Sequence, residues 1–111
     1  MIALAALLLA AQATPAPPAP VETGIENTIL VTAERMRSIR ANVGQDPEGE
    51  WHCSLSASTG SAWVDDRLCR ITTGCVRDAN ADRARVERCV TRRRAGIMDE
   101  FREHLEQERD Q

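Results

Sequence analysis

The sequence predicts a small α+β domain held together by two disulfides. Three observations support this fold class. Four cysteines lie between residues 53 and 89. Apolar and polar residues alternate before residue 56, as in strands, and apolar residues recur every three or four positions after residue 61, as in helices. We therefore expect an N-terminal strand and a β-hairpin, followed by two helices.

Residues 1–13 predict a signal peptide. They form an uncharged, apolar run of about ten residues that leads into Ala11-Gln12-Ala13, a small-x-small cleavage pattern. The run is far shorter than the about 20 residues that cross a bilayer as a helix, so the processed chain is not expected to be transmembrane. A buried N-terminal helix is the alternative. Residues 14–24 carry four of the five prolines and predict an extended linker, which leaves residues 25–111 as the folded domain.

The cysteines of this domain predict two disulfides, because a small exported domain with few large apolar side chains needs cross-links. They are Cys53, Cys69, Cys75 and Cys89. A zinc site is one alternative, but its ligands usually include short Cys-x₂₋₄-Cys pairs, and none is present. Free thiols are the other. Three disulfide connectivities are possible, of which the sequential one closes two similar loops, each contributing roughly 3 kcal/mol in the chain-entropy model.

Three segments before residue 56 predict strands. Residues 39–43 and 51–55 alternate apolar and polar side chains on either side of residues 45–49, whose Asp, Pro and Gly are typical of a turn. They predict a β-hairpin. Residues 26–33 are apolar and β-branched and predict the first strand. Residues 34–38 fit either a helical turn or a bulge.

The remaining sequence predicts two helices. Residues 58–61 offer an N-cap for the first, in which Val64, Leu68, Ile71 and Cys75 recur at helical spacing. Asp65 and Asp66 suit its N-terminal end electrostatically. Residues 78–80 predict a second cap, which opens the longest helix. Its apolar face contains Val86, Cys89, Val90, Ile97, Phe101 and Leu105, and Gly96 either kinks it or divides it in two.

The strand that ends Ser54-Leu-Ser-Ala-Ser-Thr-Gly60, the helical segment Val64-Asp-Asp-Arg-Leu68, and Cys75 with Cys89 resemble the UrcA family of small exported bacterial proteins. The resemblance covers about residues 50–95. It implies that Cys75 pairs with Cys89, which agrees with the sequential connectivity, and it supports export without implying an activity. Cys53 and Cys69 are additional to the family's pattern.

No catalytic, cofactor-binding or metal-binding residues are predicted. His52 and Cys53 are neighbours on a strand and point to opposite faces, so they do not form a nucleophile–base pair. His104 lies among charged residues at the end of the last helix, and no Gly-rich phosphate loop is present. We therefore expect a protein that is not an enzyme and that uses no cofactor.

The predicted last helix separates its charges in the order that the helix dipole disfavours. Its first half carries Arg83, Arg85, Arg88, Arg92, Arg93 and Arg94, and its second half carries Asp99, Glu100, Glu103, Glu106, Glu108 and Asp110. This pattern fits either a solvated face or a binding surface. In the second case, Arg85, Arg88 and Arg92 would bind an anionic partner, such as an anionic envelope surface or an acidic protein. Alternatively, the two halves would pair across an antiparallel homodimer.

These observations predict an exported protein, periplasmic or secreted, with a non-enzymatic interaction or structural role in the cell envelope. The alternative is a small inhibitor or binding module that presents either the turn around Pro47 or the arginine-rich helix to a specific partner protein. The net charge of −3 argues against nucleic acid as that partner.

Overall fold

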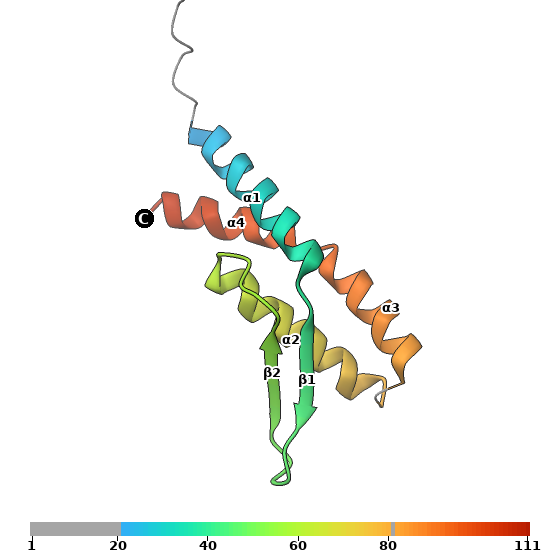
Figure 1. The fold of residues 1–111 in the computed structure, drawn as a ribbon. Coiled ribbons are helices and arrows are strands. Elements are labelled where there is room, and N and C mark those ends of the chain that lie inside the picture. The colour runs from blue at the N-terminus through green and yellow to red at the C-terminus, as the bar shows by residue number, and fades with distance from the viewer. Residues whose placement is uncertain (1–20, 81) are drawn as a thin grey trace, which may run out of the picture.

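The computed structural model describes residues 21–80 and 82–111, so the predicted signal peptide and most of the predicted linker lie outside the described residues. The elements in chain order are α1 (Val21–Ser38), β1 (Ala41–Gln45), β2 (Trp51–Leu55), α2 (Ala62–Asp78), α3 (Arg83–Arg94) and α4 (Ile97–Arg109). A hairpin and helices in one chain confirm the α+β class. Figure 1 shows α2 crossing the hairpin, while α1 and α4 cross each other at the opposite end.

The first element is a helix, so the predicted strand at residues 26–33 is wrong. Ile25, Ile29, Thr32 and Met36 lie at helical spacing, and this side of α1 packs against the core. The Thr32 hydroxyl donates to the Thr28 carbonyl one turn earlier, at 2.7 Å, so the helix satisfies this buried polar group. Tertiary packing therefore outweighs the β-propensity of this segment. The helix also begins at Val21, so it takes in the last four residues of the predicted linker, and it includes residues 34–38.

The predicted hairpin is confirmed. β1 and β2 pair antiparallel with Val43 opposite Cys53 and Gln45 opposite Trp51. Between the strands, the amide of Gly49 donates to the carbonyl of Asp46 at 2.9 Å, which closes the turn. Gly49 has φ +86°, a conformation that glycine adopts without strain.

The N-terminus of α2 is held by a set of hydrogen bonds around Asp65. Ser61 is the N-cap, and its hydroxyl accepts from the amide of Val64. The Asp65 carboxylate accepts from the Ser58 hydroxyl at 2.5 Å and from the amide and hydroxyl of the buried Thr59 at 2.8 and 2.7 Å. Burial tends to raise the pKa of Asp65, but these hydrogen bonds outweigh it and lower that pKa below its usual 3.8. The ionised carboxylate of Asp65 thus stabilises the folded chain.

The predicted long helix is divided into α3 and α4 at Ala95 and Gly96. The α3 N-cap is Asp82, not a residue of 78–80, and its side chain accepts from the amide of Arg85. The division changes the electrostatics. Arginines now occupy the last turn of α3 and acids the first turn of α4, and both placements suit the respective helix dipole.

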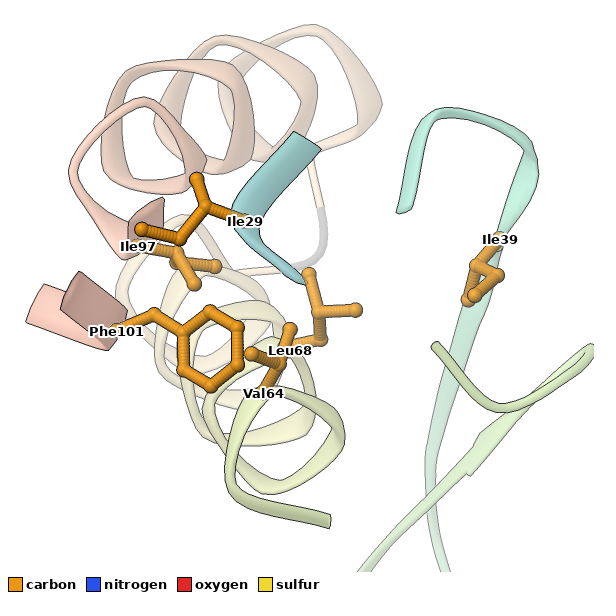
Figure 2. Close-up of a cluster of buried hydrophobic side chains, with 6 residues drawn as sticks. All are labelled: Ile29, Ile39, Val64, Leu68, Ile97 and Phe101. Carbon is orange, nitrogen blue, oxygen red and sulfur yellow. The ribbon is translucent and has the colours of Figure 1, made fainter. Parts of the chain in front are cut away.

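The core lies where α1, α2 and α4 meet (Figure 2). Val64 and Leu68 of α2, Ile97 and Phe101 of α4, and Ile29 of α1 are buried there. Ile39, on the segment that leads into the hairpin, completes the cluster. An ion pair between Arg102 of α4 and Glu26 of α1 flanks this contact on the surface.

The role of Asp65 predicts a pH-dependent stability. Because its pKa is lower in the folded chain than in the unfolded chain, the carboxylate stabilises the fold above about pH 4, and this contribution is lost as the pH falls through the folded-state pKa. We expect Asp65→Asn to reduce the free energy of unfolding by about 1–2 kcal/mol at neutral pH in urea titrations, and by progressively less as the pH falls through the folded-state pKa of Asp65.

Asp66→Asn is the matched control, because the neighbouring Asp66 contacts only the exposed side chain of Arg70, at 2.8 Å. Equal losses for the two variants at neutral pH would contradict the role assigned to Asp65.

Candidate functional site

Two disulfides start from α2 and fix its neighbours. Cys53 of β2 is bonded to Cys69, and Cys75 is bonded to Cys89 of α3, each with a Cα–Cα distance of 5.7 Å. This is the sequential connectivity, so the predicted pairing of all four cysteines is confirmed. The first bond attaches the hairpin to α2, and the second attaches α3.

The second disulfide is the main internal attachment of α3. Cys89 is the one buried residue of this helix, while α2 and α4 each bury larger side chains in the core. Val86 and Val90 are only partly buried. At the C-terminal end of α3, Arg94 donates to the carbonyl of Met36 at the end of α1, at 2.5 Å. The position of α3 therefore depends on the Cys75–Cys89 bond more than on an apolar face.

A hollow of about 350 Å³ lies between the end of α2 and α3, beside this disulfide. We call it the arginine hollow. The residues that line it are Cys75, Asp78 and Ala79 from the α2 side, and Arg85, Arg88, Cys89, Arg92 and Arg93 from α3. The three arginines that the sequence singled out, Arg85, Arg88 and Arg92, thus line one cavity, because a spacing of three and four residues places them on one side of a helix. Arg93 and Asp78 join them, which the sequence analysis did not foresee.

Arg93 has a structural partner in the hollow. Its guanidinium donates to the carboxylate of Asp78 at 3.3 Å. It also lies so close to α2 that a Cβ atom at Gly74 would be 3.2 Å from its Nη1. Arg93 therefore joins α3 to α2, and it compensates the one acid that lines the hollow.

The three predicted arginines have no such partner. Within residues 24–80 and 82–111, whose side chains the structure describes, no carboxylate forms a salt bridge with Arg85, Arg88 or Arg92. Outside these ranges the sequence has one acidic residue, Glu22. All three side chains are exposed. α3 has six arginines and one glutamate, a local charge of +5 in a chain whose net charge is −3.

Helix stability explains only part of this charge, because Arg92, Arg93 and Arg94 lie in the last turn of α3, where the helix dipole favours cations. Arg85 lies in the first turn of α3, where the helix dipole disfavours a cation, and the only acid at that end is the N-cap Asp82. The hollow therefore carries three arginines with which no described carboxylate forms a salt bridge. It is suited to hold an anion.

A second hollow, near Trp63, has charges that compensate one another. Arg67 lies 4.7 Å over the Trp63 ring and 3.4 Å from the Glu100 carboxylate. His104 stacks on the same ring at 4.9 Å and contacts Glu108 at 3.1 Å. These groups already have partners, which makes this hollow the weaker candidate.

The hairpin turn brings together Asp46, Glu50 and His52, a group that the sequence analysis missed because it treated His52 as an isolated exposed residue. Their potential ligand atoms lie within 4.8 Å of one another. Both carboxylate oxygens of Asp46 already have partners within the hairpin. One accepts from the Glu50 amide at 2.9 Å, and the other contacts His52 at 2.6 Å. The contact with His52 is the main cause that lowers the pKa of Asp46. We therefore interpret these three residues as contacts that stabilise the hairpin turn, not as a metal site.

None of the described helices is both long enough and apolar enough to span a membrane.

The attachment of α3 gives a testable prediction. We expect the double variant Cys75→Ala/Cys89→Ala to lose amide hydrogen-exchange protection in residues 83–94 while α4 and the first half of α2 remain protected. The control, Cys53→Ala/Cys69→Ala, should instead expose the hairpin. Each variant removes a cross-link that contributes roughly 3 kcal/mol. Unchanged protection of α3 in the first variant, or identical patterns in both, would contradict the prediction.

Comparisons with known proteins add no further assignment. No family model matches the sequence, and neither the curated proteins nor the solved structures include a significantly similar chain. The resemblance to the UrcA family stays a prediction. The functional assignment therefore depends on the geometry and charge of the arginine hollow.

Proposed function

We propose that this protein is an exported, non-enzymatic binding module of the cell envelope that holds an anionic partner in the arginine hollow. The observation that carries the proposal is the convergence of Arg85, Arg88 and Arg92 on one cavity, without an acidic partner from the described chain. Guanidinium groups present planar sets of donors that match carboxylate and phosphate oxygens. Three of them in one cavity form a selective anion site rather than a diffuse positive surface.

The disulfides support the placement in an oxidising compartment. Such bonds form and persist in the periplasm and outside the cell, and they are rare in the reducing cytosol. Both disulfides have a place in the fold, because one attaches the hairpin to α2 and the other attaches α3 to α2. An apolar run that ends in Ala11-Gln12-Ala13 provides the route out of the cytoplasm.

The proposal predicts that removal of the three charges abolishes capture of the partner. The processed, oxidised protein is immobilised and exposed to detergent-solubilised cell-envelope extract, and the retained material is quantified. We expect the triple variant Arg85→Gln/Arg88→Gln/Arg92→Gln to retain at least about tenfold less than the wild type, and retention by the wild type to fall as salt rises.

Arg83→Gln is the matched control. It removes the same charge from the same helix, but Arg83 does not line the hollow. This variant should behave as the wild type, and circular dichroism and thiol titration should show that all variants are folded and oxidised. The proposal is wrong if the triple variant retains as much as the wild type, or if the wild type retains nothing that salt releases.

A further inference from the structure

We infer that the arginine hollow recognises a phosphate monoester, carried either by a lipid headgroup or by a small soluble molecule. The inference rests on the proposed function and specifies its ligand. Three properties of the hollow support it: the number of uncompensated guanidiniums, the size of the cavity, and the position of acidic side chains around it.

The number of free guanidiniums fits a dianion with several oxygens. Arg85, Arg88 and Arg92 are uncompensated, while Arg93 is paired with Asp78. A carboxylate has one charge and two oxygens, and one guanidinium satisfies it bidentately. A phosphate monoester carries about −1.5 to −2 charges at neutral pH and has three terminal oxygens, so two or three guanidiniums can bind it together. The monoester is therefore the better match for the charge of the site.

The size of the cavity fits a compact ligand. Its volume of about 350 Å³ is at the lower end of the range for small-molecule sites, which is about 300–1,000 Å³. A phosphate with a short attached group fits this space. The disulfide between Cys75 and Cys89 forms part of the wall, so the distance between α2 and α3 is fixed before a ligand arrives. Such preorganisation reduces the entropy lost on binding.

Acidic side chains disfavour a long polyanion. Asp78 lines the hollow itself, and α4, which follows α3 directly, carries Asp99 and Glu100 in its first turn and further acids along its length. An extended chain of phosphates that runs along α3 towards α4 would meet these carboxylates. Figure 1 shows that the turn between α2 and α3 lies at the opposite end of α3 from α4. A single phosphate group at the Arg85 and Arg88 end of the hollow, away from the last turn of α3, avoids the acids of α4.

The pH dependence distinguishes a phosphate monoester from a phosphate diester. The second pKa of a phosphate monoester is about 6, so its affinity should rise from about pH 5 to about pH 7.5, whereas a diester has no such change. The groups that line the hollow are Asp78 of α2 and Arg85, Arg88, Arg92 and Arg93 of α3, and no histidine is among them.

Calorimetric titration of the processed, oxidised protein tests the inference with three probes. Methyl phosphate is the monoester, dimethyl phosphate is the diester, and succinate is a dianion with carboxylates. We expect methyl phosphate to bind at least about tenfold more tightly than either of the others at neutral pH, with an affinity that falls towards pH 5. Arg88→Gln should weaken it about tenfold, and Arg83→Gln should leave it within about twofold.

Vesicle flotation identifies the source of the group. Phosphatidylcholine vesicles that contain phosphatidic acid present a monoester, and vesicles of equal surface charge that contain phosphatidylglycerol present a diester. Preferential binding to phosphatidic acid supports a lipid ligand. Binding of methyl phosphate without binding to either vesicle supports a soluble one.

Equal affinity for methyl phosphate and succinate, or no loss in Arg88→Gln, would overturn the phosphate inference. If the triple variant nevertheless retains less material from the envelope extract than the wild type does, the proposed function stands and only the ligand class is wrong. If the hollow binds neither the probes nor an envelope component, both proposals fail.

Discussion

The two disulfides on α2 are the constraint on which the rest of the structure depends. Cys75 continues the apolar stripe of Val64 and Leu68, while Cys69 lies about 120° away around the helix, because successive residues turn by about 100°. One side of α2 therefore packs against the core that it shares with α1 and α4, and another side is bonded to the hairpin. With one phenylalanine and no tyrosine in the chain, covalent links take over part of the role of a larger apolar interior.

The division at Gly96 explains how the chain tolerates its separated charges. In one continuous helix, an arginine block before an acidic block would oppose the dipole. As two helices, the last turn of α3 and the first turn of α4 carry charges that suit their positions. Arg93 and Arg94 also have structural partners in Asp78 and the Met36 carbonyl. Arg85, Arg88 and Arg92 have none among the described residues, which separates the candidate binding residues from the structural ones.

Local patterns predicted the hairpin and α2, and with them a strand position for Cys53 and helix positions for Cys75 and Cys89, because alternation, capping and helical spacing are visible within short segments. The same reasoning failed at α1, where Ile29 and Thr32 are β-branched and the helical period is set by packing against α4. The pairing of Asp78 with Arg93 depends on how α2 meets α3, so no local signal reveals it. The contact of Asp46 with His52 follows from the hairpin register, which a sequence pattern leaves open. Export, the UrcA resemblance and homodimerisation remain predictions.

The most direct test of the account is the intact mass of the protein isolated from its native compartment, measured before and after reduction. The account predicts a chain that has lost residues 1–13 and that gains four hydrogens on reduction, two for each of the bonds Cys53–Cys69 and Cys75–Cys89. Thiol reagents should label the native protein at none of its cysteines. An uncleaved chain whose four thiols react without reductant would contradict it, because neither the hairpin nor α3 would then be covalently attached to α2.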